Sequence, residues 1–123
     1  MQDNERVNKV IMQKIIEYCA ESEALIQRFG ATFEKFQSDR AFQLSCSMCI
    51  VQIGELIMRL SDDFKARHTE IPWRAIKAMR NVLVHDYEDV NWQSAWNDLT
   101  KSVPELRAQP EQILAAEDDT HGN

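Results

Sequence analysis

Only three glycines and three prolines interrupt the 123 residues of this chain, and this scarcity restricts the folds open to it. Sandwiches and barrels need many turns, and turns depend on glycine and proline. The length suits one domain with a single hydrophobic core. A composition of 44% hydrophobic and 28% charged residues is typical of a packed globule. We therefore predict an all-α fold, an up-down bundle of four or five helices with short connections.

Apolar residues recur at helical spacing through most of the chain. Residues 4–19 and 22–29 each carry such a pattern, and Gly30 provides a natural stop after them. Two helices are predicted here, with a single bent helix as the alternative. Asp39 is suited to cap a helix over about 40–60, whose wide apolar arc predicts neighbours on more than one side.

Gly54 lies inside this predicted central helix, where glycine costs about 1 kcal/mol relative to alanine. Its expected use is to let another helix backbone come close, either within the chain or across a dimer. A short helix should start at Ser61 and run to about Arg67. The next helix is expected to begin at Pro72, since a first-turn residue needs no N–H, and to run to about Val84.

The last long helix is predicted to begin at Asn91, which can cap it. Pro104 should bend or end this helix, because proline lacks the N–H that a helix interior uses. Beyond that point the chain turns acidic and polar. We therefore expect residues 1–107 to form the folded domain and residues 108–123 to form a flexible tail.

Charge is distributed unevenly along the chain. The net charge of −6 argues against a generic nucleic-acid binder, because phosphate neutralisation dominates such binding. Residues 59–85, however, contain six arginines and lysines against three acidic residues, a balance of +3 that leaves −9 for the remainder. A basic face on an acidic body could accept RNA at one place and repel it elsewhere. A solvated charged face is the simpler alternative.

The cysteines and the termini suggest a compartment. The N-terminus is polar, and no apolar run reaches the length expected of a membrane span, so the cytoplasm is predicted. Three cysteines, an odd number, fit free thiols in a reducing compartment. Cys46 and Cys49 have C-x-x-C spacing, but no second pair accompanies them. We predict buried thiols and no metal site, since structural zinc normally takes four ligands.

The segment from Ile71 to Tyr87 carries the residues with the clearest chemistry. On an ideal helix its apolar residues fill one arc, while Arg80 and His85 lie about 140° apart around the axis and about 7.5 Å apart along it. Asn81 falls between them. A phosphate over Asn81 could meet Arg80 on one side and His85 on the other if the helix ends or bends near His85.

These residue types suit cleavage of RNA by attack of its own 2′-hydroxyl on the adjacent phosphorus. His85 could act as base or acid near neutral pH, and Arg80 could stabilise the transition-state charge. No metal is required, and a two-fold dimer would supply both an acid and a base. Taken one at a time, these residues have simpler interpretations. Arg80, Asn81 and His85 could be solvated or capping residues, and Tyr87 could be a half-buried packing residue.

Several pieces of sequence in one register resemble the HepT-like toxin family of HEPN domains, small helical proteins with an R-x4-H-x-Y signature. The resemblance covers most of residues 5–107. The matching pieces are Ile71-Pro-Trp73, Arg80-Asn81, His85-Asp-Tyr87 with Val90, Ile53-Gly-Glu55 upstream, and Trp96 with Val103-Pro-Glu-Leu106 downstream.

The resemblance implies a metal-independent endoribonuclease toxin of a type VII-like toxin-antitoxin system, with no cofactor and with one cleft formed by a homodimer. An MNT-type nucleotidyltransferase antitoxin would silence it by transferring AMP to a tyrosine. The expected roles are catalysis by Arg80 and His85, support by Asn81 and Asp86, AMP acceptance by Tyr87, and RNA or partner contact by Arg74, Lys77 and Trp73.

Two alternative hypotheses assign the chain to other functional classes. The chain could be a non-catalytic subunit of a nucleotidyltransferase, with its basic face holding a nucleotide or that enzyme. It could also be a plain helical dimerisation module, although a scaffold has no need of the polar set opposite the core face.

Overall fold

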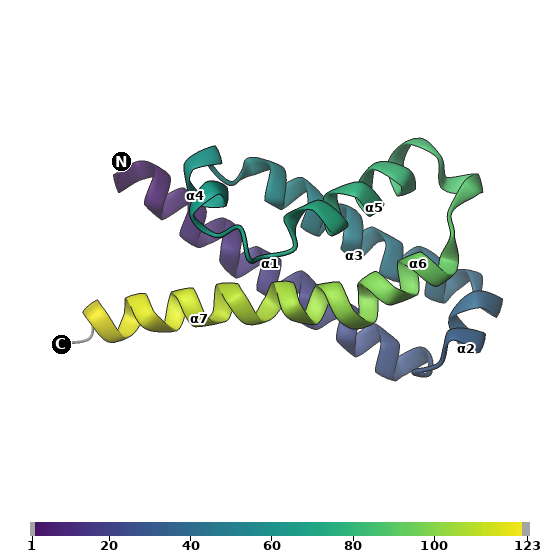
Figure 1. Ribbon diagram of the computed structural model, residues 1–123. Helices are drawn as coiled ribbons and strands as arrows, with labels where there is room; N and C mark the ends of the chain where they lie inside the picture. Colours follow the sequence, from purple (N-terminus) through teal and green to yellow (C-terminus); the bar gives the residue numbers. More distant parts are fainter. Residues whose placement is uncertain (1, 122–123) are drawn as a thin grey trace.

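The structure, a computed structural model, describes residues 2–121, with the side chains of residues 4–117. Within that span all regular structure is helical, which confirms the predicted all-α class (Figure 1). The longer helices are α1 (Gln2–Phe29), α3 (Arg40–Arg59), α5 (Trp73–His85) and α7 (Val103–His121). The shorter elements are α2 (Phe33–Ser38), α4 (Asp62–Arg67), η1 (Tyr87–Asp89), α6 (Trp92–Asn97) and η2 (Asp98–Ser102).

Most helix boundaries follow from capping residues that the sequence already indicated. The first helix is continuous, so the alternative of one helix rather than two is correct. It ends at Gly30, whose φ of 119° favours glycine and whose N–H donates to the Ile26 carbonyl. The Asp39 carboxylate accepts from the Phe42 N–H at 3.2 Å and caps α3. Asn91 caps α6 in the same way, accepting from Ser94.

The third helix is the centre of the molecule, as its wide apolar arc predicted. It packs against α1 on one side and α5 on the other, and α7 covers α1. Ile50, Ile53 and Ile57 of α3 are almost fully buried. By length and composition α3 could also cross a membrane, contrary to the sequence expectation; just over half of its apolar window is buried inside the fold, as in the core helix of a globular bundle.

The two ends of the molecule hold different groups of elements. Figure 1 shows the start of α1, helix α4 and the end of α7 together at one end. At the other end lie α2, α6 and the turn that follows α5. There the rings of Phe36, Phe42 and Trp96 pack against one another, with centroids 5.1 to 6.0 Å apart. Trp92 links this cluster to the turn after α5, because its ring packs against both Phe36 and Tyr87.

The C-terminal third corrects two expectations. The chain stays helical through Pro104, which is the second residue of α7. The irregularity comes earlier, in the π-type segment η2, where the Val103 N–H reaches back to the Asp98 carbonyl. The predicted tail from residue 108 is also wrong for the described backbone, because α7 continues to His121.

Packing explains why the helix continues there. Pro110 is buried, and Ile113 and Leu114 pack against the core. These apolar residues lie in an acidic, polar stretch whose helical pattern is weak, so their contribution is visible only in three dimensions. Residues 122–123 and the Asp118 and Asp119 side chains, which were expected in the tail, lie outside the described residues.

Candidate functional site

Helix α5 carries Arg80, Asn81 and His85, which the sequence placed opposite the core face, but Arg80 instead packs against α3 and its side chain is only 15% exposed. The apolar residues of α5, Ile76, Met79 and Leu83, are buried against the rest of the bundle. Asn81 and His85, by contrast, are exposed. The helix ends at His85, as the spacing of the motif required, because Asp86 leaves helical geometry and its N–H closes the last turn on the Val82 carbonyl at 2.8 Å.

Gly54 sets how closely α5 approaches α3. A Cβ atom on Gly54 would lie 2.6 Å from both Cβ and Cγ of Arg80. Side-chain carbons do not approach that closely, so only glycine permits this packing. The predicted close approach is therefore confirmed, and it occurs within the chain. Its effect is to lay the aliphatic stem of Arg80 directly on the α3 backbone.

The Arg80 guanidinium is held on two sides. Its Nε donates to Glu55 Oε1 at 2.7 Å, and its Nη2 forms a short ion pair with the same oxygen. Its Nη1 donates to Asn81 Oδ1 at 2.9 Å. The supporting role expected of Asn81 stays a prediction; in the structure its side-chain oxygen contacts Arg80. Glu55 was part of the resemblance, but its ion pair with Arg80 was not predicted.

Beyond the helix end, His85 and Asp86 are exposed to solvent. The pKa of Asp86 is raised above its ordinary value by a hydrogen bond shared with Asp89 and by the negative charge of that neighbour. Asp86 thus interacts with η1, and its expected support of the catalytic pair stays a prediction. His85 has open access to a substrate, which an acid or base at this position would need.

Tyr87 is half-buried in the turn after α5. Its ring packs edge-on against Trp92 with centroids 5.5 Å apart, and the Arg40 guanidinium lies over it at 5.2 Å. Its hydroxyl is shielded from solvent and has no hydrogen-bond partner among the described residues. Arg40 escaped the sequence reasoning because it begins α3, far from the motif along the chain. It brings another cation to the end of α5 where His85 lies.

The three residues expected to contact RNA or a partner lie nearer the start of α5. Arg74 and Lys77 are exposed. Trp73 is half-buried: its ring lies beside Phe64, with centroids 6.3 Å apart, and its indole N–H donates to the His68 carbonyl at 3.0 Å. Trp73 therefore fixes the loop before α5. That bond leaves it a poorer candidate for a partner contact than Arg74 or Lys77.

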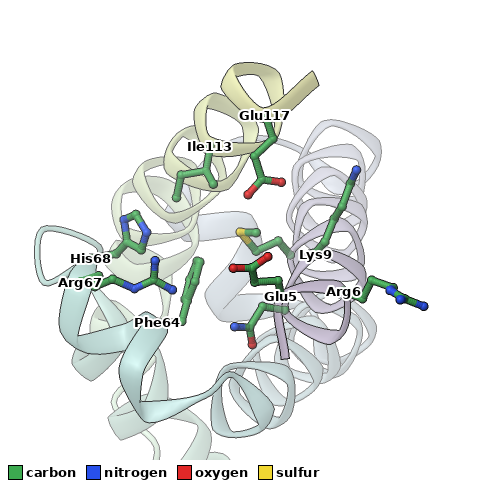
Figure 2. Close-up of a pocket in the computed structure, with 10 residues that line it drawn as sticks. Glu5, Arg6, Lys9, Phe64, Arg67, His68, Ile113 and Glu117 are labelled. Carbon is green, nitrogen blue, oxygen red and sulfur yellow. The ribbon is translucent and has the colours of Figure 1, made fainter. Parts of the chain in front are cut away.

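A pocket of about 410 Å³ lies at the opposite end of the molecule from the motif turn. Figure 2 shows Phe64, Arg67 and His68 on one side of it, α1 with Glu5 opposite, and Ile113 and Glu117 from α7 above. None of the motif residues from Arg80 to Tyr87 lines it. Its mixed charges come from side chains on the surface of three helices, and we place the candidate site at the motif instead.

The cysteines are free and buried, as predicted. Burial raises the pKa of the Cys19 and Cys46 thiols to about 12 and that of Cys49 to about 11. Thiols of this kind are poor nucleophiles at neutral pH. In the part of the chain that the structure describes, no group of three His, Cys, Asp or Glu residues is arranged to hold a metal ion.

Fold and site together define a small helical protein that carries a mostly buried arginine and an exposed histidine in the last two turns of one helix. A family model described as "Ribonuclease HepT-like" matches residues 12–113, and the chain belongs to that family. This confirms the resemblance found in the sequence, and it extends the family region past residue 107.

Curated relatives agree with the family assignment. A "Putative RNase" of Caldanaerobacter subterraneus subsp. tengcongensis is 34% identical over 107 residues, which cover 86% of this chain and 93% of the relative. A "Probable ribonuclease HepT" of Thermococcus cleftensis is 33% identical over 100 residues, covering 80% and 91%. A "Putative RNase" of Methanocaldococcus jannaschii is 26% identical over 82 residues, covering 67% and 71%. No solved structure matches the chain significantly.

Proposed function

We propose that this chain is a metal-independent endoribonuclease toxin in which Arg80 and His85 cleave RNA. The family and the RNase names of its relatives support a ribonuclease. The assignment of these two residues rests on how their side chains are placed in the structure. Arg80 is fixed by Glu55 and Asn81, and His85 is exposed where α5 ends.

The proposed reaction needs only groups that the chain and the RNA supply. The 2′-oxygen bonds to the adjacent phosphorus, its proton passes to a base, and the 5′-oxygen leaves with a proton from an acid. The products are a 2′,3′-cyclic phosphate and a 5′-hydroxyl. His85 serves as acid or base, and Arg80 stabilises the negative charge that develops on the phosphate oxygens. Arg74 and Lys77 bind flanking phosphates.

The site is proposed to be completed by a second copy of the chain. The motif of one subunit offers a single histidine, His85, and the angular spread between Arg80 and His85 leaves room for a partner's residues. Large apolar side chains stay exposed on α3 and α5, among them Leu44, Met48 and Val84. Helical spacing places Leu44 and Met48 on the side of α3 that also carries Glu55. A two-fold dimer through this face would bury them and bring two Arg80 residues together.

Regulation is proposed to act at Tyr87 in the cytoplasm. A nucleotidyltransferase antitoxin of the MNT type would transfer AMP from ATP to the Tyr87 oxygen and release pyrophosphate. The added charge and bulk beside His85 would exclude RNA. Because the hydroxyl is shielded from solvent, the turn η1 has to open before Tyr87 can react. Its missing hydrogen-bond partner makes that opening easier.

Cleavage of RNA by purified protein free of AMP tests the catalytic assignment. We expect the wild-type protein to cut in the presence of a metal chelator and His85→Ala to lose the activity. His68→Ala is the matched control, because it removes a histidine at the opposite end of the molecule and should cut normally. Equal cleavage by wild type and His85→Ala, or none by wild type, would refute the proposal and favour a non-catalytic binding subunit.

A further inference from the structure

We infer that Glu55 is a positioning residue for Arg80, holding one edge of the guanidinium so that the opposite end faces the RNA phosphate. The inference rests on the proposed ribonuclease function. Glu55 lies in the central helix α3, and Arg80 follows 25 residues later in α5.

The two helices are built to bring these side chains together. Gly54 lets the Arg80 stem lie on the α3 backbone, so the guanidinium reaches the next residue of α3, Glu55. The Arg80 side chain is only 15% exposed, whereas Glu55 is 42% exposed. Because the Arg80 side chain is mostly buried, Glu55 also compensates its charge, so charge compensation and positioning have to be separated by experiment.

The bonds to Glu55 and Asn81 leave two N–H groups of Arg80 free to bind a ligand. A guanidinium has five N–H groups in a fixed plane. Glu55 takes Nε and one Nη2 donor, and Asn81 takes one Nη1 donor. The two donors that remain are on the terminal nitrogens, one on each. Phosphate oxygens must therefore approach Arg80 from its Nη end, in a direction that Glu55 fixes.

The effect of removing Glu55 separates positioning from simple charge. If Glu55 only neutralised Arg80, its removal would strengthen RNA binding and raise activity. If it positions Arg80, its removal lets the guanidinium rotate, and the loss falls on the chemical step. A displacement of about 1 Å at a reacting group is worth up to about 100-fold in rate. We thus expect kcat to fall by about 10- to 100-fold, with KM unchanged or lower.

Steady-state RNA cleavage by the full-length chain tests this expectation with Glu55→Ala and Glu55→Gln. The glutamine keeps an acceptor oxygen and should restore part of kcat. Glu23→Ala is the matched control, since Glu23 also pairs with an arginine, Arg107, away from the motif. It should leave both constants unchanged. A kcat for Glu55→Ala at or above the wild-type value, or a loss confined to KM, would overturn the inference.

A second measurement tests the role of Glu55 even if the protein does not cleave RNA. Solvent exchange of the Arg80 Nε–H, followed by ¹⁵N NMR, should be slow in the wild-type protein and at least 10-fold faster in Glu55→Ala. Unchanged exchange would show that Glu55 does not hold the guanidinium. Wild-type cleavage equal to that of His85→Ala would instead refute the ribonuclease proposal, and the exchange rates would still decide the role of Glu55.

Discussion

Gly54→Ala places one methyl group at the contact between the central helix and the candidate catalytic arginine. The new Cβ would lie 2.6 Å from Cβ and Cγ of Arg80. Carbon atoms settle at about 3.5–4.0 Å, so the helices must separate by roughly 1 Å. A rotamer change cannot relieve the clash with Cβ, because that atom is fixed by the α5 backbone.

Two opposing free energies set the size of the effect. Alanine in place of glycine inside a helix stabilises the protein by about 1 kcal/mol. Overpacking of a tight contact costs about 1–3 kcal/mol. We expect a net loss of about 0–2 kcal/mol in the free energy of unfolding. The shift of Arg80 should also slow RNA cleavage by up to about 100-fold, because reacting groups tolerate little displacement.

Urea unfolding and RNA cleavage of the same preparations measure both effects. The informative comparison repeats Gly54→Ala in an Arg80→Gly background, which removes both atoms that clash. There the alanine should show its helix preference alone and stabilise the protein by about 1 kcal/mol. The reasoning is refuted if Gly54→Ala in the wild-type background also stabilises the protein and leaves cleavage unchanged.

Three further substitutions have measurable consequences. Tyr87→Phe removes a buried hydroxyl that has no partner among the described residues, so the free energy of unfolding should rise by up to about 1 kcal/mol. The variant should also no longer accept AMP. A clear fall in the free energy of unfolding would contradict this account. Asn8→Ala removes the acceptor of the Ser61 N–H and one of two donors to the Ser61 hydroxyl, which still accepts from the Phe64 N–H. It should cost about 1–3 kcal/mol in urea unfolding, and a loss below about 0.5 kcal/mol would count against this. Burial raises the pKa of Asp98 in the folded state. At any pH above its unfolded pKa of about 3.9, the ionised carboxylate therefore lowers the stability of the folded protein. Asp98→Asn should therefore raise the urea midpoint at pH 7, by an amount that shrinks as the pH falls towards 4; a constant difference would show another cause.

The sequence predicted those parts of the fold that local chemistry controls. Asp39 and Asn91 cap helices through bonds to residues three positions on, and Gly30 ends one by its backbone freedom. Pro104 shows the limit, because the sequence predicted a bend or an end there, yet the chain stays helical through it and the irregular segment η2 lies just before it. The helix past residue 108 depends on packing of Ile113 and Leu114 against a core that no local pattern reveals.

The candidate site, like the fold, was predicted only in part from the sequence. The spacing of Arg80 and His85 predicted a helix end at His85, and α5 does end there. The partners of the motif come from elsewhere in the chain: Glu55 lies 25 residues before Arg80, and Arg40 lies 47 residues before Tyr87. Contacts of that range depend on how helices pack, which periodicity does not specify. Trp73 shows the same limit, since its hydrogen bond to the His68 carbonyl forms only in the folded loop, and its contact with RNA or a partner stays a prediction.

The chemical ends of RNA cut by the AMP-free protein in a metal chelator test the central claim most directly. Attack by the 2′-hydroxyl, with Arg80 and His85 as the only catalytic groups, predicts fragments that end in a 2′,3′-cyclic phosphate and begin with a 5′-hydroxyl. Fragments with a 3′-hydroxyl and a 5′-phosphate, or cleavage that stops when the chelator is added, would contradict it.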